Sequence, residues 1–289
     1  ENLDEIFYIY VVDDDNILKG RLSLKKMILS PTSTKIQSIY NPDVTYVTTD
    51  EPAESVGRIM QKYDLVAIPV VDSIGRLVGR ITIDDVVDVI REEAEKDYQM
   101  MSGISQDVES SDTIWDQTKA RLPWLIIGLF GGMLAAYMIS FYEADIALFP
   151  ATAMFIPVIT AMGGNVGIQS SAIVVKGLAS NTLTSKNILQ SISKEISCAV
   201  INACICSSII FILSLCFNLT SLAMPITVTI SLFIVIMFAS MFGTAFPLLL
   251  NKLKIDPALA TGPFITLTND IIGLNIYLFT GKAILGWLL

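Results

Sequence analysis

The stretch Leu122–Tyr142, LPWLIIGLFGGMLAAYMISFY, contains no charged side chain. A helix of about 20 residues rises about 30 Å, which is the thickness of the hydrocarbon core of a bilayer. Further apolar runs of similar or greater length follow at roughly 149–175, 193–217, 223–250 and 258–287. We therefore predict that residues 121–289 form an α-helical polytopic membrane domain with five transmembrane helices.

The composition agrees with a membrane protein and excludes several kinds of chemistry. Hydrophobic residues make up 53% of the 289 residues, only 16% are charged, and the mean hydropathy is +0.61. The absence of histidine excludes Ser-His-Asp catalysis and histidine-ligated zinc. The four cysteines lie in one apolar run without C-x-x-C spacing, which predicts neither a zinc site nor disulfides. With no nucleophile–base pair in the sequence, we do not expect an enzyme.

The two halves of the chain differ in charge. Residues 1–120 contain 23 acidic and 12 basic residues, whereas residues 121–289 contain 5 and 7. An acidic half repels nucleic acid and anionic lipid, so we expect neither as a partner. A concentration of carboxylates attracts hard divalent cations, although an ordinary solvated acidic surface has the same composition.

Basic residues near the apolar runs predict the orientation in the cell membrane. If the first half is cytoplasmic, one side of the membrane receives Lys119, Arg121, Lys176, Lys186, Lys194, Lys252 and Lys254. The loops on the other side carry only Glu143 and Asp145, or no charge, and Lys282 is the exception. The positive-inside rule therefore predicts a multi-pass protein with a cytoplasmic N-terminus and its C-terminus outside.

The first half contains an internal repeat. Val11-Val12-Asp13 recurs 59 residues later as Val70-Val71-Asp72, and the four-residue stretches that begin at Leu18 and Leu77 correspond at the same offset. Each copy predicts a strand, a turn, a second strand and a helix. Residues 1–90 resemble a cytoplasmic α/β tandem CBS pair, a regulatory module of many enzymes and transporters. The first copy begins short and the chain does not begin with Met, so we expect a fragment of a longer protein.

Residues 91–120 are predicted to form an acidic connecting helix that serine and glycine interrupt at Ser102-Gly103. A helix this rich in charge also fits a solvated linker with no ligand.

Asp270 is the acidic residue that we single out inside an apolar run. It lies 14 residues after Asp256, which places it about 21 Å along a helix. Thr266 and Gly262 precede it by four and eight residues, on the same face, and are expected to offer a hydroxyl and an accessible carbonyl. Buried carboxylates in membranes are costly and usually functional. The alternative is a structural carboxyl that hydrogen-bonds to a neighbouring helix.

The second apolar run contains Pro157 and then Gly163-Gly164-Asn165-Val166-Gly167-Ile168-Gln169-Ser170-Ser171. Asn165 and Gln169 share a helix face, and the glycines permit a close approach of another backbone. Close packing between small residues would explain the same pattern without a ligand. If this stretch lies next to Asp270, the site contains only carboxylate, amide, hydroxyl and backbone oxygens, which favour Mg²⁺ or Ca²⁺ as the ligand. Because each chain supplies only one carboxylate, a bound Mg²⁺ would keep most of its water. A symmetric dimer would bring two carboxylates to one central path.

The sequence resembles the MgtE family of magnesium channels. The resemblance rests on the order of its parts and on three motifs: the Pro157–Ser170 stretch, Asp256-Pro257-Ala258, and Gly262-Pro263 followed by Asn269-Asp270-Ile271 and Gly273. It implies a homodimer whose second and fifth spans line a pore. In that pore Asp270 would bind hydrated Mg²⁺, with Asn165, Ala161, Gly262 and Thr266 along the path.

The resemblance also implies cytoplasmic Mg²⁺ sensor sites, with the carboxylates of Asp85, Asp88, Glu93 and Asp97. Bound Mg²⁺ would neutralise facing carboxylates and lock the pore closed. The family's N-terminal domain is absent from the sequence, and Lys96 stands where an acidic residue can occur. We expect these departures to weaken the sensor.

ATP is a further partner implied by the resemblance, because some CBS pairs of the family bind it. Thr82 and Asp85 have the spacing of a ribose-binding motif, whereas the first copy has Ser23 followed by Lys26 and lacks the acid.

The leading hypothesis is a Mg²⁺ channel or transporter for magnesium uptake, gated by cytoplasmic Mg²⁺. Transport of another divalent cation such as Co²⁺ or Mn²⁺, or coupling to Na⁺ or H⁺, remains open. A membrane-anchored CBS ligand sensor without ion flux is an alternative of a different class.

Overall fold

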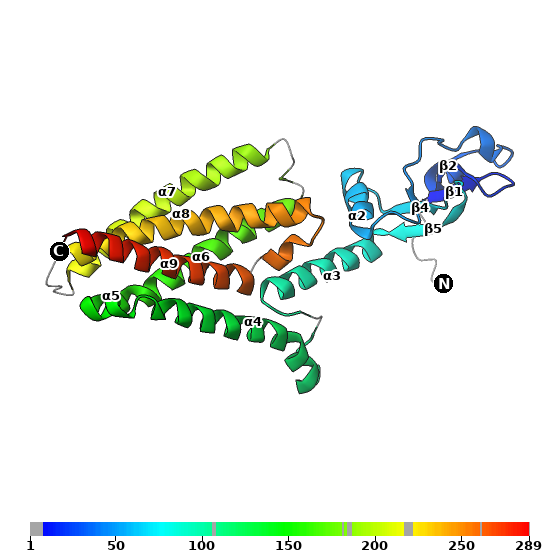
Figure 1. The fold of residues 1–289 in the computed structure, drawn as a ribbon. Helices are drawn as coiled ribbons and strands as arrows, with labels where there is room; N and C mark the ends of the chain where they lie inside the picture. Colours follow the sequence, from blue (N-terminus) through cyan, green and yellow to red (C-terminus); the bar gives the residue numbers. More distant parts are fainter. Residues whose placement is uncertain are drawn as a thin grey trace. The chain divides into compact units, whose positions relative to one another are not determined.

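A computed structural model describes residues 8–105, 108–180, 182–183, 187–216, 222–260 and 262–288. The chain divides into two compact units between Glu95 and Lys96. The first unit is a mixed α/β structure, and the second consists of helices (Figure 1).

Two β-hairpins form the first unit, as the repeat predicts. In the first copy, β1 (Tyr8–Val12) pairs antiparallel with β2 (Leu18–Ser23), and α1 (Leu24–Leu29) follows. In the second copy, β4 (Ala67–Val71) pairs antiparallel with β5 (Leu77–Thr82), and α3 (Ile83–Met101) follows. The remaining elements are η1 (Ile36–Ser38), β3 (Val47–Thr48), which is parallel to β4, and α2 (Ala53–Lys62).

The repeated aspartate has the same structural role in both hairpins. Asp13 Oδ1 accepts a hydrogen bond from the Ile17 N–H at 2.8 Å, and Asp72 Oδ1 accepts one from the Arg76 N–H at 2.8 Å. Aspartate favours such turns because its short side chain reaches nearby backbone donors. Backbone hydrogen bonds also join the two turns, since the Leu18 N–H donates to Gly75 O at 3.0 Å.

The core of the first unit is small. Among the described residues, its main cluster consists of five buried residues from β3, α2, β4 and α3, namely Val47, Val56, Met60, Ile68 and Val86, and Leu22 and Val71 are also buried. Apolar side chains on one face of α2 pack between the sheet and α3, so α2 is held by burial of that face.

The second unit begins with the end of α3 and contains the long helices. These are α4 (Ile114–Ser140), α6 (Ala151–Ala179), α7 (Ile188–Leu215), α8 (Ala223–Lys252) and α9 (Pro263–Leu288), with the short α5 (Glu143–Leu148) and η2 (Pro257–Ala260). Among the described residues, four of them, α4, α6, α7 and α8, are long and apolar enough to cross a membrane. The sequence predicted a fifth such run at α9.

The acidic connecting helix is divided in two. Helix α3 ends at Met101, Gly103 adopts a positive φ of 76°, and α4 begins at Ile114. The Thr113 hydroxyl caps α4 by accepting the Asp116 N–H. The predicted interruption at Ser102-Gly103 therefore marks the end of α3.

Helix α8 lies against α6, α7 and α9 in the centre of the second unit (Figure 1). The core contains Ile159 from α6, Leu232 and Ile236 from α8, and Leu274 and Tyr277 from α9, each 2% exposed or less. The Tyr277 hydroxyl donates to Thr152 O at 2.9 Å and so connects α9 to α6. This packing fixes the faces that α6 and α9 present to each other.

Candidate ion-binding sites

The carboxylate of Asp270 on α9 lies against a glycine of α6. A Cβ atom built on Gly164 would stand 3.5 Å from Asp270 Oδ1 and 3.2 Å from Thr266 Cγ2. Asp270 is half-buried, and no hydrogen bond or ion pair joins it to another residue in the described part of the chain. The structure therefore brings Asp270 and Thr266 together beside α6, with the carboxylate oxygens available to a ligand.

Thr266 and Gly262 share a face as predicted, but the carbonyl of Gly262 is not free. Both the N–H and the hydroxyl of Thr266 donate to Gly262 O, each at 3.1 Å. A carbonyl oxygen has two lone pairs, so these donors occupy it. The expected accessible carbonyl at Gly262 was wrong, and the lone pairs of the Thr266 hydroxyl are the remaining oxygen donor.

Gly262 instead serves a close backbone contact. Its φ is +61°, and a Cβ there would stand 2.1 Å from the carbonyl oxygen of Met101 at the end of α3. Only glycine combines a left-handed backbone with this approach. Gly262 thus positions the start of α9 rather than offering a ligand atom.

The amide side chain of Asn165 and its neighbours form an exposed stripe on α6. Ala161, Asn165 and Gln169 are exposed and four residues apart, whereas Gly163, Gly164 and Gly167 on the adjacent face are buried. Asn165 directly follows Gly164, which lies against Asp270, but makes no hydrogen bond to Asp270 in the described part of the chain. The stripe leaves a polar helix face without a partner inside the second unit.

Asn269 is a residue that the sequence analysis quoted but did not interpret. It is 1% exposed, and neither Nδ2 nor Oδ1 has a hydrogen-bond partner. A Cβ on Gly167 would stand 1.9 Å from its Nδ2, so the amide fills the space that the glycine leaves. A partial signal was present, because Asn269 follows the apolar Ile265 by four residues and so shares its helix face, which the structure shows to be buried.

The predicted sensor carboxylates lie on α3. Asp85, Asp88 and Glu93 are exposed, and Asp97 is half-buried. No group of three acidic or cysteine residues able to hold a metal occurs among the described residues. The structure of the single chain therefore assembles neither a pore site nor a sensor site with three protein carboxylates.

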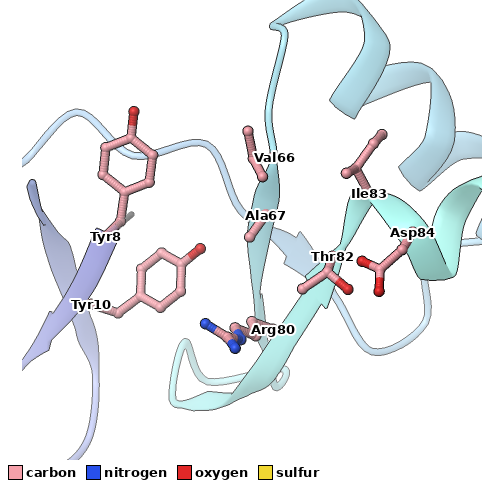
Figure 2. Close-up of a pocket in the computed structure, with 8 residues that line it drawn as sticks. All are labelled: Tyr8, Tyr10, Val66, Ala67, Arg80, Thr82, Ile83 and Asp84. Atoms are coloured by element: carbon pink, nitrogen blue, oxygen red, sulfur yellow. The ribbon is translucent and has the colours of Figure 1, made fainter. Parts of the chain in front are cut away.

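A cavity of about 350 Å³ in the first unit lies between the two copies of the repeat (Figure 2). Its polar lining consists of Tyr8 and Tyr10 from β1, Arg80 and Thr82 from β5, and Asp84 from α3. Burial raises the pKa of the Tyr10 phenol, although Arg80 and Arg21 oppose the shift, so the phenol is neutral near pH 7.

Only one residue of the predicted nucleotide motif lines this cavity. Asp85 accepts the Thr82 hydroxyl at 2.6 Å and the Thr82 N–H at 3.3 Å, as in a helix capping box. The acid in the cavity is its neighbour Asp84. Sequence reasoning missed Tyr8, Tyr10 and Arg80, yet strand alternation could have found them, since Tyr8 and Tyr10, like Arg80 and Thr82, are two residues apart.

Comparison with known proteins identifies the family. The sequence model of the MgtE family, a divalent cation transporter, matches residues 156–280, and that of the CBS domain matches residues 36–92. The magnesium transporter MgtE of Bacillus subtilis (strain 168) is 36% identical over 277 residues, which is 96% of this chain and 61% of that protein. The chain belongs to the MgtE family.

Two more relatives support the assignment of this MgtE-family chain. The magnesium transporters MgtE of Thermus thermophilus and Enterococcus faecalis are 34% and 35% identical over 98% and 95% of this chain. The chain covers 63% and 60% of their lengths, so it spans about three fifths of the curated relatives it matches. Among solved structures, the cytosolic domain of the Mg²⁺ channel MgtE in complex with ATP aligns with 30% of this chain and 35% of its own, at 51% identity and a TM-score of 0.29.

The family and the four apolar helices make this a multi-pass membrane protein that contains a CBS domain. The recognition of the MgtE family from its motifs is therefore confirmed.

Proposed function

We propose that this chain forms a pathway for Mg²⁺ through the membrane, with Asp270 as the central ion-binding residue. The observation that carries the proposal is the half-buried Asp270 carboxylate, which faces Gly164 and has no described partner within the chain. An unpaired carboxylate among apolar helices is costly, and a cation passing along the helix face compensates that cost. The magnesium transporters among its relatives support Mg²⁺ as the substrate.

The pathway requires a fifth membrane span, which we assign to α9. Its 26 residues rise about 39 Å, enough to cross the hydrocarbon core. With the first unit in the cytoplasm, the C-terminus then lies outside, in agreement with the lysines near the inner ends of the helices.

A second copy of the chain completes the pathway. The exposed stripe of Ala161, Asn165 and Gln169 lies on α6 next to Gly164, which faces Asp270. The side-chain amides of Asn165 and Gln169 provide oxygens for an ion path that two copies of the chain would share. Two copies would contribute two Asp270 carboxylates and two Thr266 hydroxyls. Because Mg²⁺ sheds water reluctantly, these oxygens would bind its hydration shell. Co²⁺ or Mn²⁺ remain alternative substrates.

The test is Mg²⁺ influx into proteoliposomes with an internal Mg²⁺ dye. Asp270→Asn keeps the side-chain volume and removes the charge, so influx should fall at least about tenfold. Glu143→Gln, an exposed acidic residue of α5, is the matched control and should retain influx. Equal influx through the native chain and Asp270→Asn would place the pathway elsewhere.

Cytoplasmic Mg²⁺ gates the pathway through the carboxylates of α3, in our proposal. Asp88 and Glu93 are exposed and so free to meet acidic residues of other segments, where Mg²⁺ would relieve the repulsion. Millimolar Mg²⁺ should then reduce protease cleavage of the first unit, and the combined variant Asp88→Asn and Glu93→Gln should abolish this protection. Identical cleavage with and without Mg²⁺ would exclude gating by these residues.

A second function, adenine nucleotide binding, is supported by the cavity of the first unit. Tyr8 and Tyr10 offer aromatic faces for a base, Arg80 a positive charge for phosphate, and Asp84 an acceptor for ribose hydroxyls. A fluorescent ATP analogue should bind the native chain, and Arg80→Met should weaken binding by about tenfold. Nucleotide binding without any Mg²⁺ flux would favour the membrane-anchored sensor.

A further inference from the structure

A second acidic side chain lies among the long helices, apart from the Asp270 region. Glu195 is half-buried near the start of α7. Its Oε1 accepts hydrogen bonds from Ser170 of α6 at 2.6 Å and Ser240 of α8 at 2.9 Å. The two serines are 3% and 1% exposed, so the carboxylate is anchored from within the helix bundle.

Glu195 also lines a cavity of about 250 Å³ bounded by α6, α7 and α8. The hydroxyl-bearing residues of this cavity are Ser191, Thr182 and Thr244. Ser191 precedes Glu195 by four residues on the same face of α7. Thr244 donates its hydroxyl proton to Ser240 O at 2.8 Å, so its oxygen lone pairs remain available.

The hydrogen bonds leave one carboxylate oxygen for the cavity. Both serines donate to Oε1, and in the described part of the chain no donor reaches Oε2. The other described lining residues are apolar or small, with no lysine or arginine among them: Ile173, Val174, Gly177, Leu183, Ile188, Ile192 and Leu248. The carboxylate therefore faces a largely apolar cavity with hydroxyl oxygens and no basic side chain from these residues.

Charge balance decides which ligand fits. A carboxylate taken from water needs a positive counter-charge, and a monovalent cation neutralises it, whereas a divalent cation would leave a net positive charge among apolar helices. Carboxylate and hydroxyl oxygens are hard donors, which suit alkali cations and disfavour softer metals. A cavity of this size also admits a few waters to complete the coordination, at about 30 Å³ each.

We propose that this cavity binds a monovalent alkali cation, which is held by the carboxylate of Glu195 and the hydroxyls of Thr244 and Ser191. Ser170 and Ser240 fix the orientation of the carboxylate through their hydrogen bonds to Oε1, so that Oε2 is left for the cation. The site is separate from the Asp270 region, because no described residue of α9 lines the cavity.

The experiment measures binding of ²²Na⁺ to the full chain in lipid nanodiscs at constant ionic strength with choline. Saturable binding is expected for the native chain. Glu195→Gln keeps a hydrogen-bond acceptor for the serines but removes the charge, and should weaken binding by about tenfold or more. Thr244→Val, which should fold even if the Glu195 variant does not, should weaken it severalfold.

Matched controls separate this site from the rest of the molecule. Thr229→Val changes a half-buried threonine elsewhere on α8, whose hydroxyl donates to Pro225 O at 2.7 Å, and should leave ²²Na⁺ binding unchanged. Asp270→Asn should also retain ²²Na⁺ binding, so failure of the proposed Mg²⁺ pathway would not affect this result.

Three results would overturn the site. They are the absence of saturable ²²Na⁺ binding, equal binding by the native chain and both cavity variants, and displacement of ²²Na⁺ by Mg²⁺ at far lower concentrations than by K⁺. The last would show a divalent-cation site instead.

Discussion

The two units hold their acidic side chains in different ways. In the first unit, Asp13 and Asp72 lie on hairpin turns, where backbone N–H groups of the same turn donate to them and Lys19 also pairs with Asp13. In the second unit, Glu195 is bound by serines of two other helices and Asp270 by no described residue. A carboxylate that water solvates does not need a hydrogen-bond partner from the protein. Among apolar helices an unpaired carboxylate is costly, so its partner must come from a distant segment of the chain or from a ligand.

Glycines permit close backbone approach in both units, but between different elements. In the first unit, a Cβ on Gly20 of β2 would clash with the carbonyl oxygen of Asn41, whereas in the second a Cβ on Gly243 of α8 would stand 2.5 Å from the carbonyl oxygen of Gly167 on α6. The second unit therefore adds close backbone contact between helices to the burial of apolar side chains that both units share.

Truncation of the core of the first unit should have the largest effect. Met60 is 0% exposed in a core of five residues, so Met60→Ala should destabilise this unit by about 2–5 kcal/mol. Hydrogen exchange of the β4 amides in the full chain measures the loss, with Val78→Ala at an exposed position as the control. Unchanged exchange of β4 would show that burial is not what stabilises this unit.

A methyl group added where the backbones of α6 and α8 meet should have the second-largest effect. Because a backbone oxygen cannot move aside as a side chain does, Gly243→Ala should separate α6 from α8 and cost about 1–3 kcal/mol. Gly132→Ala on α4, where nothing lies within 4 Å, should be neutral. Thermal unfolding of both variants in detergent tests this, and equal midpoints would show that the contact between Gly243 and Gly167 does not stabilise the second unit.

The ion pair between α5 and α9 should contribute less. Lys282 Nζ and Asp145 Oδ2 are 3.0 Å apart, but the side chains are 60% and 31% exposed. A double-mutant cycle with Lys282→Met and Asp145→Asn should give a coupling of about 0.2–1 kcal/mol, reduced by salt. A larger, salt-independent coupling would indicate that this end of the bundle is shielded from water.

Acid should have the smallest effect, confined to the first hairpin. The ion pair with Lys19 at 2.9 Å, together with the Ile17 N–H, lowers the pKa of Asp13 below its usual 3.8. The stabilisation is complete above that usual value and is lost as the pH falls through the lowered pKa. The free energy that opposes opening of the β1–β2 hairpin should therefore fall at acid pH, which increases hydrogen exchange of the β1 amides. Asp13→Asn should remove the part of this pH dependence that comes from the Asp13 carboxylate.

Local patterns predicted much of the fold. The 59-residue repeat identified both hairpins, because strand alternation and turn-forming aspartates act within a few residues. Apolar runs identified the helices that became α4, α6, α7 and α8, since length and hydrophobicity suffice for that assignment. Thr266 and Asp270 were placed on one face by helical spacing alone.

Two expectations from the sequence differ from the structure because of how side chains rotate within one helical turn. The Gly262 carbonyl was expected to be free, but the Thr266 hydroxyl rotates onto it. Asp85 was read as a ribose ligand, whereas it caps α3 and Asp84 faces the cavity. Side-chain rotation of this kind depends on which donors lie nearby, and residue spacing does not specify it.

The amino-acid sequence alone therefore determined the elements, the repeat, the family motifs and the acidic residue Asp270 of the last apolar run, because each depends on residue type and short-range periodicity. Only the tertiary structure decided that Asp270 faces Gly164, that the β1 tyrosines meet Arg80, and that Ser170 and Ser240 converge on Glu195. The physical reason is that helix rotation and register are set by the packing of whole faces, here by glycines that admit another backbone, and no single segment contains that information.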